Sequence, residues 1–385
     1  MASPLRLFRS APRIANLTCY QRRHVSAFGY TQAKALVYSA YGEPSTVLKL
    51  HSHSLRPAYD EEILIKFLAS PINPADINQI EGVYPAKPEL TIALGTPEKS
   101  AVGGNEGVVE VVSVGANVKG YKPGDRAIMK HTSFGTWRTH ALAKDENLLR
   151  IPDEFKDISP LSAATISVNP CTAYRMLKDF ADLEEGDWFI QNGANSGVGR
   201  AAIQLGKIWG LKSVNVIRER PDVDALKKEL MDLGADIVVT DAELQSRGFY
   251  WEMQEKTQGK GIKLGLNCVG GKATHYLIKC LGEGGHVVTY GAMSKQPLNL
   301  NASSLIFKDI HAHGFWVSRW SDRNPEAKAE MVAEIFRFIQ QGKFKEVPFE
   351  KTIWNSDSTE EQLVGAVAKS GQAFGNKKQV FVFEE

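Results

Sequence analysis

Three closely spaced glycines form the clearest chemical motif in the chain. Gly193, Gly197 and Gly199 follow an apolar run at residues 188–191 and precede a helical pattern at residues 201–209. Glycine lets the backbone approach a pyrophosphate closely, and the N-terminus of a helix offers free N–H groups and the positive end of a dipole. Because the motif lies between a strand and a helix, it predicts a dinucleotide-binding turn rather than a merely structural one.

Two arginines flank an acid at the end of the next expected strand. Arg218, Glu219 and Arg220 lie about 20 residues after the glycines, where such sites hold the adenosine ribose. Glu219 would suit the ribose hydroxyl of NAD, whereas the two guanidinium groups suit the 2′-phosphate dianion of NADP. A solvated surface cluster would have the same composition. The paired arginines favour NADPH as the cofactor.

Elements of two kinds must position these residues. The first part of the chain has short β-rich runs separated by Gly and Pro, which indicate a mainly-β domain. The middle alternates strands with helices, which indicates βαβ units and a parallel sheet. The tail is expected to return to the first domain. The expected strands are 35–38, 63–69, 107–114, 126–130, 188–191, 213–217, 237–240, 264–268, 286–290, 349–354 and 379–383, and the expected helices are 201–209, 223–233, 273–281, 325–341 and 360–369.

The composition is that of an ordinary soluble protein of 385 residues, with 43% hydrophobic and 23% charged residues. This length favours two domains. A net charge of +2 gives no argument for nucleic-acid binding, and the sequence has no apolar run long enough for membrane insertion. The four cysteines are Cys19, Cys171, Cys268 and Cys280, and they are too far apart to form a CxxC pair. They predict neither a disulfide framework nor a zinc cluster.

The first 30 residues differ from the rest. They contain five arginines, several Ser and Ala, and no acidic residue. The apolar residues Leu5, Leu7 and Phe8 are broken too soon by Arg9 to form the continuous apolar region of a secretory signal. A disordered basic tail is the alternative, but the composition favours a mitochondrial presequence at 1–25 and a location in the mitochondrial matrix.

The order of these pieces resembles the medium-chain dehydrogenase/reductase superfamily. The residues that carry this resemblance are 73–76, 104–107, 115–118, 124–126, 163–164 and 172–174. Zinc alcohol dehydrogenases of the superfamily place Cys where this chain has Pro74-Ala75-Asp76, and His where it has Asn105. Without these ligands no metal is expected, and alcohol oxidation by the zinc mechanism is excluded. Quinone reductases and enoyl thioester reductases remain.

Within this superfamily, the chain is most similar to the enoyl thioester reductases of mitochondrial fatty acid synthesis. The matching residues are 78–85, 103–107, 169–170, 195–199, 218–220, 290–293 and 314–317. One departure is Glu219, where the family often has Asp. The resemblance implies a GroES-like catalytic domain at 28–165, a Rossmann domain at 166–322, a return to the catalytic domain at 323–385, and a homodimer.

The resemblance also implies the site residues. Tyr84 is expected to be the general acid, because a phenol keeps its proton at neutral pH and can release it to an enolate. Trp316 is expected to line the same pocket. A packing role for Tyr84 or Trp316, and a solvated charge at Lys378, are the alternatives. The implied cofactor contacts are Asn169, Asn195, Ser196, Gly197, Val198, Arg218, Glu219, Arg220, Tyr290, Gly291, Ala292, Met293, Phe315, Trp316, Val317 and Lys378.

The expected reaction is therefore NADPH-dependent reduction of an enoyl thioester carried on acyl carrier protein or CoA. The nearest alternative is a zinc-free NADPH:quinone reductase, which shares the fold and needs no dedicated acid. A non-enzymatic RNA-binding protein is a further alternative, since some relatives in the superfamily bind RNA. The chain has no basic stripe with interleaved aromatic residues, which argues against that role.

Overall fold

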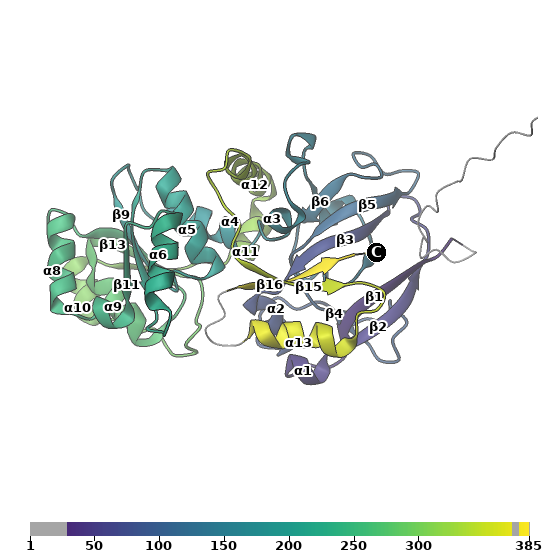
Figure 1. Cartoon of the computed structure of the whole chain (residues 1–385), viewed down its shortest axis with the longest axis horizontal. Coiled ribbons are helices and arrows are strands. Elements are labelled where there is room, and N and C mark those ends of the chain that lie inside the picture. Colours follow the sequence, from purple (N-terminus) through teal and green to yellow (C-terminus); the bar gives the residue numbers. More distant parts are fainter. Residues whose placement is uncertain (1–28, 372–376, 385) are drawn as a thin grey trace, which may run out of the picture.

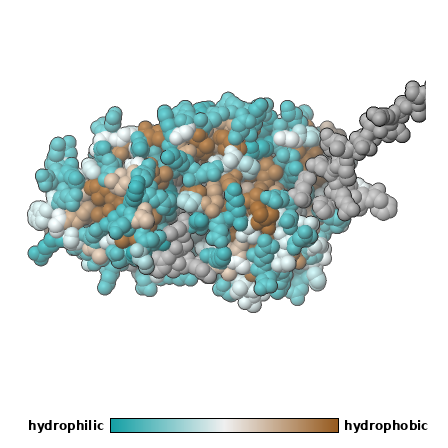
Figure 2. All heavy atoms as spheres, viewed as in Figure 1, coloured by the Kyte–Doolittle hydropathy of each residue, from teal (hydrophilic) through white to brown (hydrophobic). Residues whose placement is uncertain are grey.

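The computed structural model of the chain describes residues 29–371 and 377–384, and these residues form two lobes (Figure 1). The expected presequence at 1–25 lies outside the described residues. No described helix has the length and apolar character needed to cross a membrane. The face shown in Figure 2 is mainly hydrophilic, with hydrophobic atoms exposed in smaller patches.

The first lobe is mainly β-structure. A three-stranded sheet has the order β2-β1-β4, and a second sheet has the order β15-β16-β3-β5-β6-β8 with β7 paired to β3. Trp137 and Trp354 are fully buried in its core. Its elements are β1 (Thr31–Tyr38), α1 (Pro44–Val47), β2 (Lys49–Leu55), β3 (Ile63–Pro71), α2 (Pro74–Ile80), β4 (Ala101–Val102), β5 (Val108–Val114), β6 (Arg126–Met129), β7 (His140–Ala143), β8 (Leu148–Arg150) and α3 (Pro160–Ala164).

The second lobe is a six-stranded parallel sheet with helices on its faces. The strand order is β11-β10-β9-β12-β13-β14, which is the order of dinucleotide-binding sheets. Helix α4 (Asn169–Asp179) leads into it from the first lobe. Its elements are β9 (Trp188–Asn192), α5 (Gly197–Ile208), β10 (Lys212–Ile217), α6 (Val223–Leu233), β11 (Ile237–Thr240), α7 (Asp241–Leu244), α8 (Arg247–Lys256), β12 (Ile262–Asn267), α9 (Gly271–Lys279), β13 (Leu281–Thr289), α10 (Ala302–Lys308) and β14 (His311–Gly314).

The tail lies against the first lobe. After α11 (Val317–Arg323) and α12 (Pro325–Gln340), the chain forms β15 (Phe349–Trp354), α13 (Glu360–Ser370) and β16 (Lys378–Phe383). Strand β16 pairs in parallel with β15 and antiparallel with β3, so the C-terminal strand lies inside the first lobe's larger sheet (Figure 1). Both expected layers, the mainly-β domain and the parallel sheet, are therefore present.

Several elements were not expected from the sequence. Helix α5 begins at Gly197, four residues before the expected start at 201, because the Ser196 hydroxyl caps it by accepting from the Gly199 N–H at 3.1 Å. Strand β14 reads His-Ala-His-Gly, which lacks the apolar character on which strand prediction depends. A strong hydrophobic periodicity is also missing from the sequences of strands β2, β7 and β8 and of helices α8, α10 and α11.

Candidate active site

The carboxyl edge of the parallel sheet gathers most of the expected cofactor residues. Residues 195–198 follow β9, residues 218–220 follow β10, residues 290–293 follow β13 and residues 315–317 follow β14. Since the carboxyl ends of parallel strands meet at one edge, four segments far apart in the sequence lie along the same edge of the sheet. This is where open α/β sheets bind their ligands.

The glycine turn at this edge has no room for larger residues. Gly193 has φ +63°, and a Cβ there would lie 2.4 Å from the Cys268 Sγ. A Cβ on Gly199 would lie 2.5 Å from the Ala194 carbonyl oxygen, so this glycine lets α5 pack closely on the turn. The turn and the capped N-terminus of α5 therefore fit the pyrophosphate of a dinucleotide.

The segment after β10 that holds the two arginines also contacts carboxylates. The Arg220 Nε is 2.5 Å from Asp222 Oδ1, and the Glu219 N–H donates to Asp241 Oδ1 at 3.3 Å. Arg218 and Glu219 are exposed at the end of the strand. The ion pair with Asp222 holds the Arg220 guanidinium in one orientation.

Tyr84 and Trp316 meet across the two lobes. Tyr84 lies in the loop after α2, and Trp316 directly precedes α11. The Trp316 Nε1–H donates to the Tyr84 oxygen at 2.7 Å, and the two rings are perpendicular with centroids 5.7 Å apart. The Arg319 guanidinium lies 5.0 Å from the centre of the Trp316 ring. Trp316 is thus a partner of Tyr84 and not simply a core residue.

The direction of this hydrogen bond determines what the phenol can do. An indole N–H only donates, so the Tyr84 oxygen must accept, and its own proton remains available to another acceptor. Burial raises the pKa of Tyr84 above its ordinary value, and hydrogen bonds from Trp316 and Ser318 oppose that rise. The phenol therefore stays protonated at neutral pH, while both donors would stabilise the phenolate left after proton transfer.

A buried polar cluster lies beneath the junction of the lobes. The Asn73 Oδ1 accepts from the Lys378 ammonium, and the Asn73 Nδ2 donates to Glu106 Oε2 at 3.0 Å. Glu106 Oε1 also accepts from the Val168 N–H at 2.9 Å, and Asn169 approaches Asn73 at 3.5 Å. Burial lowers the pKa of Lys378, and the nearby carboxylates Glu106 and Asp76 oppose this shift. Lys378 is half-buried, and its ammonium is bonded to Asn73 at this cluster.

The positions that hold zinc in metal-dependent relatives have other partners here. Asn105 Nδ2 donates to Asp76 Oδ1 at 2.6 Å, and burial raises the pKa of Asp76 to about 6. Among residues 29–371 and 377–384, no group of three or more His, Cys, Asp or Glu side chains could hold a metal ion. An amide bound to a carboxylate does not fit a catalytic zinc site, which needs three protein ligands around one open position.

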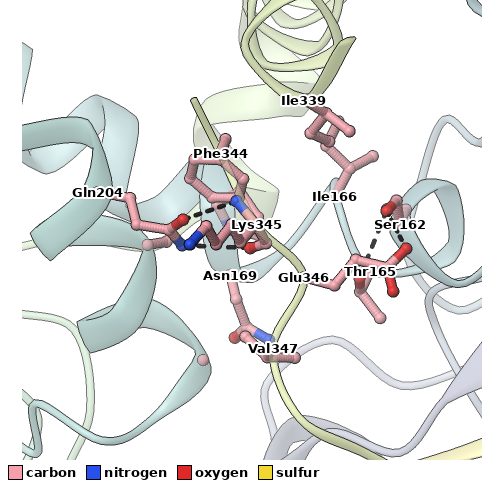
Figure 3. Close-up of a pocket in the computed structure, with 13 residues that line it drawn as sticks. Ser162, Thr165, Ile166, Asn169, Gln204, Ile339, Phe344, Lys345, Glu346 and Val347 are labelled. Carbon is pink, nitrogen blue, oxygen red and sulfur yellow. Dashed lines mark hydrogen bonds between the residues drawn. The ribbon is translucent and has the colours of Figure 1, made fainter. Parts of the chain in front are cut away.

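A small pocket opens between the lobes beside α5 (Figure 3). Gln204 pairs with the backbone of Lys345 through its oxygen at 2.6 Å and its amide nitrogen at 3.2 Å. On the other side, Ser162 donates to the Glu346 carboxylate. The segment after α12 therefore ties the helix that follows the glycine turn to the first lobe. Asn169 and Gly197 also line this pocket.

Sequence analysis missed part of the site. It did not assign roles to Gln79, Ser133 or Ser318, and it treated Asn105 only as a missing zinc ligand. Gln79 and Asn105 are nearly inaccessible to solvent, although both carry amides. The signal available in the sequence was the polar pair Asn105-Glu106 within the glycine-rich stretch 103–107. Of the expected cofactor residues, Met293 is 64% exposed and Val317 is buried, so they lie at different depths.

Two family descriptions match the two lobes. Residues 59–153 match the alcohol dehydrogenase GroES-like domain, and residues 197–335 match the family described as zinc-binding dehydrogenase. These matches confirm the expected fold class. The second description does not extend to zinc ligands in this chain, which has Pro74-Ala75-Asp76 and Asn105 where zinc alcohol dehydrogenases have Cys and His.

Individual relatives identify the family to which the chain belongs within this superfamily. A mitochondrial enoyl-acyl-carrier-protein reductase of Yarrowia lipolytica is 45% identical over 356 residues, covering 91% of this chain and 92% of the relative. The structure of the mitochondrial 2-enoyl thioester reductase Etr1p/Etr2p heterodimer from Candida tropicalis has a TM-score of 0.87 at 39% identity, covering 91% of this chain and 99% of the other. A structure of Etr1p with NADP and crotonyl-CoA has a TM-score of 0.87 at 38% identity over the same shares. The chain therefore belongs to the mitochondrial enoyl thioester reductases of the medium-chain dehydrogenase/reductase superfamily.

Proposed function

We propose that the chain reduces the carbon–carbon double bond of trans-2-enoyl thioesters with NADPH in the mitochondrion. The observation that carries this function is the Tyr84–Trp316 pair, in which the phenol accepts one hydrogen bond and keeps its proton. The Etr1p structure bound to NADP and crotonyl-CoA supports the same cofactor and substrate class for this chain.

NADPH, when bound, supplies a hydride to Cβ of the enoyl thioester. Negative charge then develops on the thioester oxygen and on Cα, and Tyr84 donates the phenol proton to Cα. Trp316 and Ser318 stabilise the resulting phenolate through their hydrogen bonds, until a proton from water restores the phenol. Hydride at Cβ and proton at Cα together give the saturated acyl thioester.

The residues of the sheet edge would hold the cofactor. Residues 195–198 would bind the pyrophosphate, and Arg218 and Arg220 would bind the 2′-phosphate. Residues 290–293 and 315–317 would border the nicotinamide half. Lys378 and Asn169 would approach the cofactor from the first lobe, because both join the Asn73 cluster at the junction.

Steady-state kinetics tests this function. Crotonyl-CoA and longer trans-2-enoyl thioesters, with NADPH and with NADH, should be reduced at rates that greatly favour NADPH. Quinones should be poor substrates. Rapid quinone reduction without enoyl reduction would instead support the zinc-free quinone reductase.

Two further proposals concern the carrier of the enoyl group and the compartment within the mitochondrion. Acyl carrier protein is the proposed carrier alongside CoA, in keeping with the description of the Yarrowia relative. The basic, acid-free N-terminal residues support import into the matrix through a presequence at 1–25. A fusion of residues 1–29 to a soluble reporter should therefore reach the matrix, and cytosolic retention would contradict the proposal.

A homodimer is the proposed assembly, and the outer side of the second lobe supports it. Strand β14 is the last strand in its sheet's order, and its outer edge has no pairing strand among the described residues. Helix α10, which precedes β14, exposes 43% of Leu305, 69% of Ile306 and 79% of Phe307. An unpaired edge strand beside exposed apolar side chains is suited to pairing with a second copy of the chain.

A further inference from the structure

The loop that carries Tyr84 is held on both sides by the last turn of α2. The N–H groups of Val83 and Tyr84 donate to the Asn78 carbonyl at 2.9 and 3.1 Å. Two residues after Tyr84, the Ala86 carbonyl accepts from the Gln79 Nε2 at 2.7 Å. One helical turn therefore contacts the backbone at Tyr84 itself and just beyond it.

The orientation of the Gln79 amide is determined by its neighbours. A carboxylate only accepts, so Asp76 Oδ1 requires the Asn105 NH₂ group to face it, at 2.6 Å. The same NH₂ group donates to Gln79 Oε1 at 2.6 Å, which leaves the Gln79 Nε2 for the Ala86 carbonyl and, at 3.2 Å, for the Ser133 hydroxyl. The Asn105 amide therefore donates in two directions, to the Asp76 carboxylate and to Gln79, and Gln79 in turn donates to the loop carbonyl.

A second bond fixes the Asn105 amide independently. The Ser133 N–H donates to Asn105 Oδ1 at 2.6 Å, so Asn105 cannot turn over without losing a donor and an acceptor together. Gln79 is only 3% exposed, and Asp76 only 1%. Bulk water therefore does not replace these bonds, and a broken one leaves an unsatisfied buried group.

We propose that Gln79 is a positioning residue for proton transfer, which holds the Tyr84 loop so that the phenol lies at the substrate Cα. This proposal rests on the proposed function, in which Tyr84 is the acid. Trp316 fixes the phenol oxygen from the second lobe, and Gln79 fixes the backbone from the first. Gln79 itself touches neither substrate nor cofactor, so it acts only through Tyr84.

The test is a double-mutant cycle with NADPH and crotonyl-CoA. Gln79→Met keeps the side-chain length and removes both donors, so kcat should fall about 10- to 100-fold, as for a misplaced catalytic group, with KM for NADPH unchanged. In the Tyr84→Phe background the same substitution should cause no further fall, because the group that it positions is already absent. An unchanged kcat in the single variant, or an equal fall in both backgrounds, would overturn the proposal.

Two further variants keep the test decisive. Thr257→Val removes a buried hydroxyl that bonds the Met253 carbonyl at 2.7 Å in the second lobe, and it should lower stability without lowering kcat. If Gln79→Met does not fold, Ser133→Ala removes one Gln79 partner and should give a smaller fall that also vanishes with Tyr84→Phe. A wild-type enzyme that does not reduce crotonyl-CoA would refute the proposed function itself.

Discussion

At the scale of single residues, the proposed proton transfer depends on which group donates each hydrogen bond. Trp316 fills one acceptor position of the Tyr84 oxygen and leaves the phenol proton free. Because the burial of the ring raises the pKa of Tyr84, the proton is retained until negative charge develops beside it. The pair is thus prepared for an acceptor that appears only during the reaction, which favours catalysis over ground-state binding.

Tyr84→Phe removes the hydroxyl and leaves the ring. Enoyl reduction should fall roughly 10²- to 10⁴-fold, the usual contribution of a positioned general acid. The fall should appear in kcat more than in KM, and Trp316→Leu should give a smaller one. Circular dichroism and NADPH binding serve as controls for folding. A Phe variant with nearly the wild-type rate would make Tyr84 a packing residue.

The arginine pair after β10 should decide cofactor choice. Replacing Arg218 and Arg220 by Gln should raise KM for NADPH by about one to two decades each, because each charge-assisted hydrogen bond contributes about 1.5–3 kcal/mol. KM for NADH should change little. Lys212→Gln, at the opposite end of the same strand, is the matched control. Equal effects on both cofactors would show that the pair does not bind the 2′-phosphate.

At the scale of elements, two different edges of the parallel sheet have two different proposed roles, cofactor binding and dimer formation. The carboxyl ends of its strands are followed by the residues proposed to hold the cofactor, whereas the outer side of β14 has no pairing strand in the described part of the chain. Helix α10 places its exposed apolar side chains just before that edge strand. The proposed cofactor site and the proposed dimer interface therefore use different edges of the same sheet, so substitutions can test one without affecting the other.

Charging the exposed face of α10 should separate the subunits. Ile306→Glu combined with Phe307→Glu should shift the protein from dimer to monomer in analytical ultracentrifugation, because two buried carboxylates would oppose the apolar contact. Ile92→Glu is the control, since this residue is 66% exposed on the first lobe. A dimer that survives the double substitution would place the interface elsewhere.

At the scale of the whole molecule, local patterns could be predicted and long-range pairings could not. The glycine turn, the strands 237–240 and 349–354 and the helix 223–233 follow from period and composition, and the structure has them. Tyr84 and Trp316 are 232 positions apart, and Asn105 and Gln79 are 26 apart. The local sequence does not determine which amide bonds to which carboxylate. The role of Tyr84 as the acid was therefore inferred from the family resemblance alone, and the contact of Gln79 was not predicted.

Stability should decrease in mild acid because of His53. Burial first, and then the charge of Arg138, lower the pKa of His53 to about 4 in the folded state. The unfolded chain, with a histidine pKa near 6.5, therefore binds the proton first, and stability falls as pH drops from about 6.5 towards 4. Thermal unfolding of His53→Phe should show a loss between pH 7 and pH 5 that is smaller by on the order of 1–2 kcal/mol. An unchanged loss would exclude His53 as the cause.

The place of β16 has a consequence for how the chain matures. The first lobe needs residues 378–383 between β15 and β3, whereas the second lobe is built from one continuous stretch. Because a chain is synthesised from its N-terminus, β3 has an open edge at residues 69–71 until β16 has been made. During that interval the incomplete first lobe exposes an unpaired strand, a substrate for chaperones and a hazard for aggregation. The larger sheet of the first lobe can therefore be completed only after residues 378–383 have been synthesised.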